Sequence, residues 1–375
     1  MISRRQFFSG AAAASSAMGR FRNALAAVLS AEKTIPGAIR WDAWYAPSDV
    51  NTEVDKSLGP PEWHSRAPWF ARPTASDSIS IDGGQQTTID TEIRYAVQAR
   101  LQYWAFVWYG AKSPMQSAWR LYQSSKLRNQ IKWCLLLAVS NQGGAKGFKA
   151  ASPEYIGYLT QPNYQTVLNG RPLLYVLMDS DKSVGAWGGY GGIAASLRDF
   201  RHGAQQSGTP DPYVVLLRAP AKNAAEAARA CSFDAISTYV PIMKPGYPIS
   251  WQEQEGSVER VWQAYADTGF PLVLNCVTGW DQRPRLEKAE KQPGAHQALA
   301  ETHQNYTIPP TADQLTAHLQ SGVDYVLKHP NSFPAKTVLI YSWDECDEGG
   351  NAIVPSYTPT GPNTSIVAAL RRVDW

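Results

Sequence analysis

Four carboxylate side chains fall within five residues near the C-terminus, in the segment 341–350, YSWDECDEGG. They are Asp344, Glu345, Asp347 and Glu348. Carboxylates this close together repel one another and raise each other's pKa values. A site that needs an acid and a base at one glycosidic bond would use such a pair. A solvated acidic turn or a cation-binding loop is the alternative interpretation.

The acid cluster directly follows residues 336–340, KTVLI, whose β-branched and apolar residues predict a buried strand. Seven similar runs precede it, at residues 37–45, 103–109, 131–139, 172–178, 213–217, 233–240 and 270–277. Helix-like stretches lie between them, which is typical of parallel strands covered on both faces. We therefore predict an α/β fold, a single-domain (β/α)8 TIM barrel over residues 32–375. A doubly wound sheet is the competing architecture, but no Gly-rich phosphate fingerprint follows the first strand.

A barrel of this kind carries its active site at the C-terminal ends of its strands. The chain also has 14 Trp and 18 Tyr, and flat aromatic faces pack against the apolar face of a pyranose. Candidate substrate-binding residues are therefore those that follow the strands, with His64 on the long loop after the first: Trp41, Asp42, Trp44, Tyr45, His64, Trp108, Tyr109, Tyr239, Trp280, Asp281, Arg283, Trp343 and Asp344. The alternatives are core packing for the aromatic residues and structural roles for Asp42, for His64 and for an Asp281–Arg283 or Asp281–Arg285 pair.

The N-terminal residues 1–31 match a twin-arginine signal peptide. Arg4 and Arg5 precede two phenylalanines, an Ala-rich run follows, and residues 24–26, ALA, suit cleavage. An Ala-rich amphipathic helix is the alternative. Export by the twin-arginine translocon would place the mature protein in the periplasm or outside the cell. No later run is long enough to span a membrane, and a net charge of +3 without a basic stripe argues against nucleic acid as a partner.

The cysteines and other potential metal ligands show no spacing typical of a zinc site, and no G-x-S-x-G motif is present. We expect no cofactor and no metal; a divalent cation at Asp344 and Asp347 is the alternative. In an oxidising compartment Cys276 and Cys346, at the ends of neighbouring barrel strands, could form a disulfide. Free buried thiols are equally compatible with the sequence.

Three stretches resemble the glycoside hydrolase family 99-like group, which is related to family 71. Residues 43–47, AWYAP, are similar to that group's A-W-Y-G-x-P strand end, and residues 90–109 resemble its acidic helix followed by an aromatic strand. Residues 345–349, ECDEG, resemble its E-x-x-E-G motif. Relative to the common N-E-W-H-E-G form, Asp344 replaces Asn, Cys346 replaces Trp and Asp347 replaces His, which leaves both glutamates in place.

The resemblance implies a retaining glycoside hydrolase, endo-α-mannosidase-like, that acts on an oligosaccharide or polysaccharide. It implies that Glu345 is the base at the substrate 2-hydroxyl, whose oxygen attacks C1, and that Glu348 is the acid/base. In an ordinary two-carboxylate scheme Asp42 or Asp281 would instead partner Glu348, about 5 Å away for retention. A different class also stays open, because fold alone does not give activity: a non-catalytic carbohydrate-binding or polysaccharide-assembly accessory protein on the same barrel. The sequence leaves open which sugar and linkage are cleaved and whether the action is endo or exo.

Overall fold

The computed structural model describes residues 33–45, 49–241, 248–290, 306–349 and 351–375, without the side chains of 49–51 and 287–290. The chain divides into two units, Met1–Thr34 and Ile35–Trp375, and the second contains every helix and strand described below. The predicted signal peptide, residues 1–31, lies outside the described residues.

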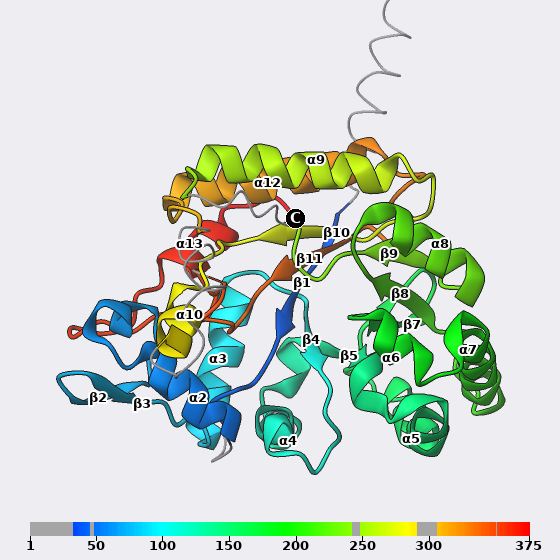
Figure 1. Cartoon of the computed structure of the whole chain (residues 1–375), viewed down its shortest axis with the longest axis horizontal. Helices are drawn as coiled ribbons and strands as arrows, with labels where there is room; N and C mark the ends of the chain where they lie inside the picture. The colour runs from blue at the N-terminus through cyan, green and yellow to red at the C-terminus, as the bar shows by residue number, and fades with distance from the viewer. Residues whose placement is uncertain (1–32, 46–48, 242–247, 291–305, 350) are drawn as a thin grey trace, which may run out of the picture. The chain divides into compact units, whose positions relative to one another are not determined.

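Eight parallel strands form the barrel wall, in the order β10-β11-β1-β4-β5-β7-β8-β9 (Figure 1). A parallel bridge between Ile236 and Leu272 joins β9 to the segment that enters β10, which closes the ring. The predicted (β/α)8 barrel is thereby confirmed. The strands are β1 (Ile35–Arg40), β4 (Tyr103–Val107), β5 (Lys132–Ala138), β7 (Arg171–Leu177), β8 (Tyr213–Leu217), β9 (Ala235–Ser237), β10 (Leu274–Val277) and β11 (Thr337–Tyr341).

Helices follow the strands and form the outer layer. The larger ones are α3 (Gln86–Gln98), α4 (Ser117–Ser124), α5 (Gly144–Leu159), α7 (Gly189–Gln206), α8 (Ala221–Cys231), α9 (Trp251–Ala266) and α12 (Ala312–Lys328). Shorter elements decorate the loops: α2 (Asp49–Leu58), α6 (Asp181–Gly185), α10 (Arg283–Glu290), α13 (Ser365–Arg371), the hairpin β2 (Arg72–Ala75) and β3 (Ser78–Ser80), and β6 (Thr166–Val167). The described residues also form four short 3-10 helices: η1 (Pro61–Arg66), η2 (Pro114–Gln116), η3 (Arg128–Gln130) and η4 (Val139–Gln142).

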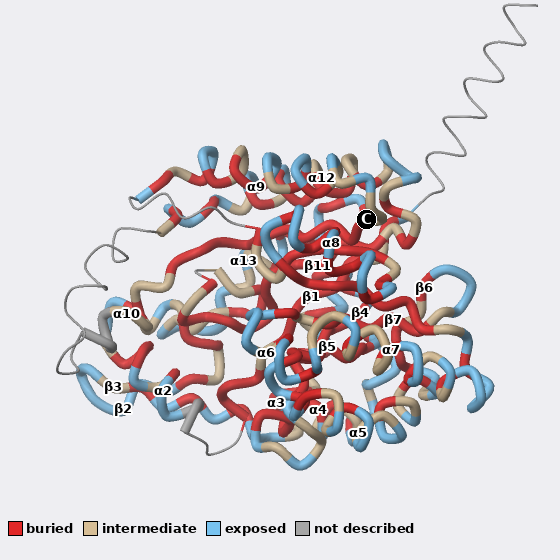
Figure 2. Tube along the Cα trace, turned by 45° about the vertical axis from the view of Figure 1, so that its right-hand side comes forward, coloured by how far each residue is buried: buried red, intermediate tan, exposed pale blue. Residues whose placement is uncertain are grey.

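Helix α12 illustrates how the sequence specifies these elements. Thr311 caps its first turn, and Gln314 returns the bond in a reciprocal capping box. Leu315, Leu319 and Val323 then recur every four residues and are completely buried, so one face of the helix packs on the barrel. Figure 2 shows the same division throughout, with buried strands inside and exposed outer turns on the surrounding helices.

Several predicted strand boundaries were wrong. Strand β1 ends at Arg40, so residues 41–45 form a loop rather than the end of the strand. Strands β9 and β10 are shorter than the predicted runs 233–240 and 270–277. In α3, Asp90 accepts hydrogen bonds from the Gln86 amide (2.8 Å) and from the Ser125 hydroxyl (2.6 Å), and the second of these joins α3 to the end of α4.

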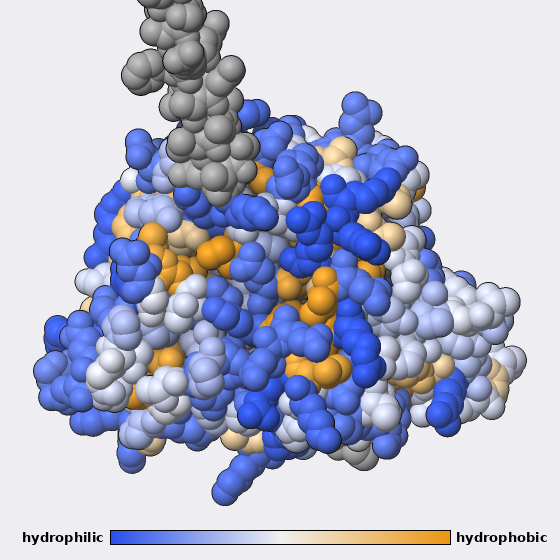
Figure 3. Space-filling model, turned by 180° about the vertical axis from the view of Figure 1, so that it is seen from behind, coloured by the Kyte–Doolittle hydropathy of each residue, from blue (hydrophilic) through white to orange (hydrophobic). Residues whose placement is uncertain are grey.

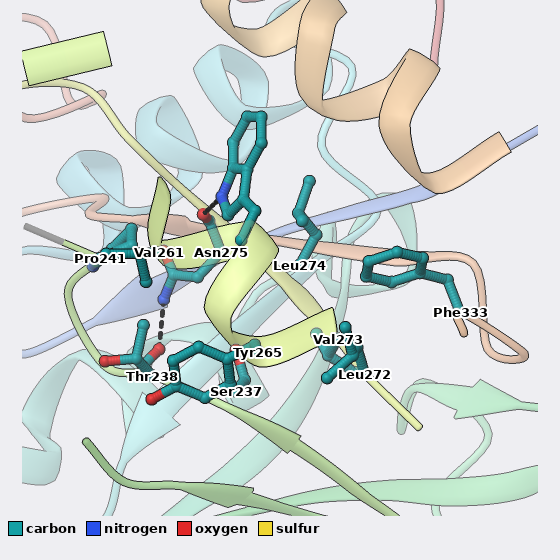
Figure 4. A pocket seen from close by; sticks show the side chains of 11 residues that line it. Ser237, Thr238, Pro241, Val261, Tyr265, Leu272, Val273, Leu274, Asn275 and Phe333 are labelled. Carbon is teal, nitrogen blue, oxygen red and sulfur yellow. Dashed lines mark hydrogen bonds between the residues drawn. The ribbon is translucent and has the colours of Figure 1, made fainter. Parts of the chain in front are cut away.

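An asparagine side chain holds the seam between β9 and β10 together. The Asn275 amide donates to the carbonyls of Thr238 (2.6 Å) and Tyr239 (2.8 Å), and Trp262 of α9 donates to the Asn275 carbonyl (2.8 Å). A small cavity of about 20 Å³ lies beside Asn275, as Figure 4 shows, and has room for one water molecule. The Asn275 side chain thus bonds to the backbone that follows β9, where strand-to-strand hydrogen bonds end, and so fixes the position of Tyr239 next to the acid cluster.

The face of the molecule seen in Figure 3 is mainly hydrophilic, with a few hydrophobic patches between the polar side chains. The exposed large hydrophobic residues, Val97, Tyr109, Leu168 and Ile308, come from separate parts of the barrel. Among the described residues no helix is long and apolar enough to cross a membrane. All four cysteines are free and buried, so of the two interpretations left open by the sequence, the structure has the free thiols.

Gly37 gives a test of the barrel packing. A Cβ atom at this position would lie 2.0 Å from the nearest atom of the Tyr103 ring, which crosses β1 at that point. We therefore expect Gly37→Ala to destabilise the protein by about 1–3 kcal/mol, because an extra methyl group in a packed core forces its neighbours apart. The measurement is chemical unfolding of wild type and variant.

The control is Gly157→Ala, in the exposed part of α5, where a Cβ atom meets nothing within 4 Å. This change should leave the stability unchanged or raise it by up to about 1 kcal/mol, since Ala is the better helix former. Equal unfolding midpoints for the two variants would contradict the proposed contact.

Candidate active site

The acid cluster lies at the C-terminal end of β11, in the loop that follows Tyr341. Hydrogen bonds within this loop fix its shape: the Glu345 amide donates to the Ser342 hydroxyl (3.1 Å), and the Gly349 amide donates to the Glu345 carbonyl (2.6 Å). The Asp281 amide, after β10, donates to the Glu348 carbonyl (2.9 Å). The loop is therefore anchored to the neighbouring strand, and its side chains are held in fixed directions.

The two glutamates meet at one tyrosine hydroxyl. The hydroxyl of Tyr341 lies 3.0 Å from Oε2 of Glu345 and 2.9 Å from Oε1 of Glu348. Glu345 is 4% exposed and Tyr341 is completely buried, whereas the Glu348 side chain retains 14% of its exposure. The two carboxyl groups are thus neighbours in space as well as in sequence, and Glu348 is the more open of the two.

A second tyrosine contacts the inner glutamate. The hydroxyl of Tyr239, which follows β9, donates to Oε1 of Glu345 over 2.5 Å. Burial raises the pKa of Glu345, while the hydrogen bond from Tyr239 and the positive charge of Arg285 act in the opposite direction. A carboxyl group with a raised pKa is suited to exchange protons near neutral pH.

Arg285, in α10, is the cation of the site. Its guanidinium binds Asp347 through two hydrogen bonds, of 2.8 and 3.0 Å, and also pairs with Glu348. Burial acts to lower the pKa of Arg285, but the charge and hydrogen bonds of Asp347, together with the charge of Glu345, raise it above its usual range. Because Asp347 already compensates the charge of the guanidinium, Glu348 can be protonated without leaving Arg285 unpaired.

Aromatic side chains surround the pair. The indole of Trp41 donates to the hydroxyl of Tyr109 (2.8 Å), and the Arg285 guanidinium lies 5.2 Å from the Trp41 ring centroid. Tyr109 is 38% exposed. The Trp280 ring lies 6.1 Å from that of Tyr341. Of the predicted substrate-binding residues, the structure thus brings Trp41, Tyr109, Tyr239 and Trp280 together with Glu345 and Glu348.

Three other predicted substrate-binding residues belong to a buried ionic network around Arg40, at the end of β1. The guanidinium donates to Asp42 (2.7 Å) and to Tyr45 (2.6 Å), and lies 4.0 Å from Asp344. It also binds Glu92 of α3 (2.6 Å). Arg40 and its partners are all nearly inaccessible to solvent. In this structure Asp42, Tyr45 and Asp344 thus belong to the surroundings of a buried charge, and their assignment to substrate binding stays a prediction.

Four further predicted residues also have structural surroundings. Trp44, Trp108 and Trp343 are at most 1% exposed and pack on Phe70, Trp119 and Trp104 respectively, with ring centroids 5.0–6.2 Å apart. The ring of His64 contacts the Gly59 carbonyl (2.6 Å). The three tryptophans are thus core residues in this structure, whereas His64 is half-buried; the assignment of these four residues to substrate binding stays a prediction.

Asp281 and Arg283 form the predicted structural pair. Arg283 binds the Asp281 carboxylate through Nε (2.9 Å) and Nη2 (2.8 Å), and Arg66 of η1 reaches the same carboxylate (3.0 Å). Both guanidiniums face the ring of Trp63, at 5.0 and 5.3 Å. A cavity of about 370 Å³ borders this group and is also lined by Cys346 and Asn351.

Sequence reasoning missed three residues of the site. Tyr341 is the last residue of β11, so the rule that barrel strands end in functional residues would have included it. Asp347 was considered only as a cation ligand, and Arg285 only as a partner of Asp281. Among the described residues, no group of three His, Cys, Asp or Glu side chains could hold a metal ion.

Comparisons with known proteins give a likeness of fold. Neither a protein-family model nor a curated protein matches the sequence. Two structures of the family 99 endo-α-mannosidase from Bacteroides thetaiotaomicron, one with bis-tris-propane bound, share 12% identity with this chain at a TM-score of 0.54. The match covers 90% of this chain and 95% of the mannosidase. A chitinase from Trichuris suis matches at a TM-score of 0.41, too low to carry an argument. The chain therefore has the family 99-like fold.

The Arg40 network predicts a pH-dependent stability. Burial, and then the charge of Asp42, raise the pKa of Asp344 well above its usual range; burial raises the pKa of Asp42 to about 6. A carboxyl group whose pKa is higher in the folded than in the unfolded state stabilises the fold at low pH. That stability is lost as the pH rises from the unfolded pKa, near 4, through the folded value.

We expect Asp344→Asn to remove this loss, because the amide oxygen can still accept from the Trp41 backbone amide (2.8 Å) without carrying a charge. The stability of the variant relative to wild type should rise by up to about 1.4 kcal/mol per pH unit between pH 5 and 8. Urea unfolding at several pH values measures it. The control is Asp313→Asn, whose side chain is 85% exposed and which should show no trend; an equally flat difference for Asp344→Asn would refute the buried-charge account.

Proposed function

We propose that this chain is an exported glycoside hydrolase that cleaves α-linked glycans, α-mannoside-like, with retention of configuration. The observation that carries the proposal is the pair Glu345 and Glu348, held against one buried hydroxyl at the C-terminal end of β11. Two carboxyl groups at that end of a barrel are the machinery of glycosidic bond cleavage. The family 99-like fold supports this assignment, since the neighbours named above are endo-α-mannosidases.

In this proposal Glu345 is the base at the substrate 2-hydroxyl. It accepts hydrogen bonds from Tyr239 and Tyr341, which stabilise its ionised form. Its burial at the same time makes that carboxylate a stronger base than an exposed one. Deprotonation of the 2-hydroxyl lets its oxygen attack C1 of the same sugar.

Glu348 is the acid/base of the proposal. It is the more open of the two carboxyl groups, and so can reach the oxygen of the leaving group. It would donate a proton to that oxygen and then take one from the attacking water. The alternative scheme, with Asp42 or Asp281 as the second carboxylate, has less support, because both residues are only 3% exposed and are held by arginine side chains.

Trp41 and Tyr109 are the proposed platform for the sugar, since they lie next to the acid pair and Tyr109 offers exposed aromatic surface. The cavity of about 370 Å³ beside Asp281 and Arg66 offers space and polar groups for a further sugar unit. An oligosaccharide or polysaccharide substrate is therefore favoured over a single monosaccharide glycoside.

We expect Glu348→Gln and Glu345→Gln each to lower turnover by at least about 10²–10⁴-fold while the glycan still binds, because each change removes a proton donor or acceptor and keeps the side-chain shape. The measurement is product release from α-mannans and other bacterial and fungal polysaccharides by the mature protein. Glu226→Gln, an exposed change in α8, is the matched control and should retain full activity.

Wild-type turnover by either glutamine variant would refute the assigned roles. Binding of a glycan by all variants without product release by the wild type would refute the hydrolase. That result would leave the chain as a carbohydrate-binding or polysaccharide-assembly protein on the same barrel.

Export gives a separate prediction. The proposed twin-arginine signal requires Arg4 and Arg5, so replacing both with Lys should keep the protein in the cytoplasm of the producing cell. Cell fractionation and immunoblotting measure its location. Replacing Arg20 and Arg22 with Lys, later in the same segment, should leave export intact; equal export of both variants and the wild type would contradict a twin-arginine signal.

A further inference from the structure

One buried hydroxyl lies between the two carboxyl groups of the site. Tyr341 contacts Glu345 at 3.0 Å and Glu348 at 2.9 Å, both within hydrogen-bond range. Its ring is fixed from two sides: the Tyr239 ring meets it edge-on at 5.6 Å, and Trp280 lies 6.1 Å away. The hydroxyl therefore has little freedom to leave either contact.

The number of protons at this hydroxyl is limited. Burial and the charge of Glu345 raise the pKa of Tyr341 well above its usual range, so the phenol stays protonated and has one hydrogen to donate. If both glutamates were ionised, only one of them could accept that hydrogen fully, and the other would face an oxygen lone pair. Both contacts are good hydrogen bonds only if one glutamate is protonated and donates to the Tyr341 oxygen.

We propose that Tyr341 holds the Glu345–Glu348 pair in its singly protonated form and passes the proton between them. In the transfer the O–H bond of Glu348 breaks as its proton moves to the Tyr341 oxygen. The Tyr341 O–H bond breaks in turn as its own proton moves to Glu345. Glu348 becomes the carboxylate, Glu345 becomes the neutral acid, and Tyr341 is regenerated.

The charged and titratable groups around Tyr341 are compatible with one shared proton. Arg285 of α10 pairs with Glu348 itself, and Asp347 of the acid loop binds the same guanidinium and compensates its charge. Tyr239, after β9, donates to Glu345, and Tyr109, after β4, is a further titratable group near that carboxylate. Among the described residues around the pair, there is thus no uncompensated cation that would favour ionisation of both glutamates.

This inference rests on the proposed function, because a hydrolase of this type begins its reaction with one glutamate ionised and the other protonated. Tyr341 contacts both glutamates rather than the substrate in this scheme, so it is a positioning residue. It secures the required state over a wider pH range than two independent carboxyl groups would have.

The test is a pH titration of Tyr341→Phe. In the wild type, kcat/KM should follow a bell-shaped pH profile, because only the singly protonated pair is active. Loss of the Tyr341 hydroxyl destabilises this form relative to the doubly protonated pair at low pH and the fully ionised pair at high pH. Both limbs of the profile should therefore move inward, and the bell should narrow by about one to two pH units, the size of a hydrogen bond to a charged group. Tyr239→Phe is the matched control: it removes a donor to ionised Glu345 alone, so only the acid limb should move.

An infrared titration makes the same test without substrate. The titration is made in an Asp344→Asn background and above pH 7, because Asp344 is another buried carboxyl group with a raised pKa and Asp42 has a pKa of about 6. There the carbonyl stretch of a protonated carboxyl group should be present, and it should disappear when either Glu345→Gln or Glu348→Gln is added, since the two residues share one proton. Persistence of that band in either variant would overturn the proposal. Unmoved limbs, or an unchanged infrared titration, in a Tyr341→Phe protein with a native circular dichroism spectrum would overturn it too. A wild type that cleaves no glycan but shows the shared band would refute the hydrolase and leave the shared proton in place.

Discussion

The buried guanidinium of Arg40 is the constraint on which this end of the barrel depends. A charge without solvent costs several kcal/mol unless hydrogen-bonded partners of opposite charge surround it. Arg40 has partners from three parts of the chain: Asp42 and the Tyr45 hydroxyl in the loop after β1, Glu92 in α3, and Asp344, 4.0 Å away, after β11. Its guanidinium also lies 4.5 Å from the Trp104 ring of β4. The three strands β11, β1 and β4 are hydrogen-bonded neighbours, so this network connects the loops after β11 and β1 with β4.

That constraint divides the acid cluster between structure and chemistry. Asp344 lies 4.0 Å from Arg40, and Asp347 binds Arg285 through two hydrogen bonds, so two of the four acidic residues belong to arginine networks. Glu345 and Glu348 are left, and a tyrosine hydroxyl rather than repulsion sets their relation. The loop between them must be rigid for this to hold, and the Asp281 amide and the Ser342 hydroxyl supply the bonds that fix it. The charge crowding evident in the sequence is thus relieved in space by partners that are far away along the chain.

The barrel could be predicted from the sequence because its parallel strands are buried on both faces. Such strands are continuous apolar runs, and these are visible in the sequence without any other information. It also located the acid loop, since polarity changes abruptly after Ile340. It could not separate aromatic residues that border the site from those in the core: Trp108 and Tyr109 are adjacent, yet the first packs on Trp119 and the second is exposed. Which side chains at a strand end face the core and which face the site depends on the residue at which the strand ends. Strand β1 ends at Arg40 rather than at Tyr45, and Asp42 and Tyr45 in the following loop turn back to bind the Arg40 guanidinium. A contact across 304 positions, from Arg40 to Asp344, leaves no local signal.

The departures from the family 99-like motif have a physical reason in these contacts. Asp344 stands where that motif has Asn, and Asp347 where it has His, so each exchange introduces a carboxyl group beside the two glutamates in the sequence. Each carboxyl group lies near an arginine, Asp344 4.0 Å from Arg40 and Asp347 2.8 Å from Arg285. Burial raises the pKa of Asp344 and so opposes its ionisation, whereas the charge of Asp347 is compensated by Arg285. Without Arg285, the charge of Asp347 would favour the protonated forms of the nearby glutamates and remove the base. The exchange at Asp347 is therefore compatible with an acid–base pair only together with Arg285, which couples α10 to the site. The same loop that departs from the motif thus retains the charge balance on which the proposed chemistry depends.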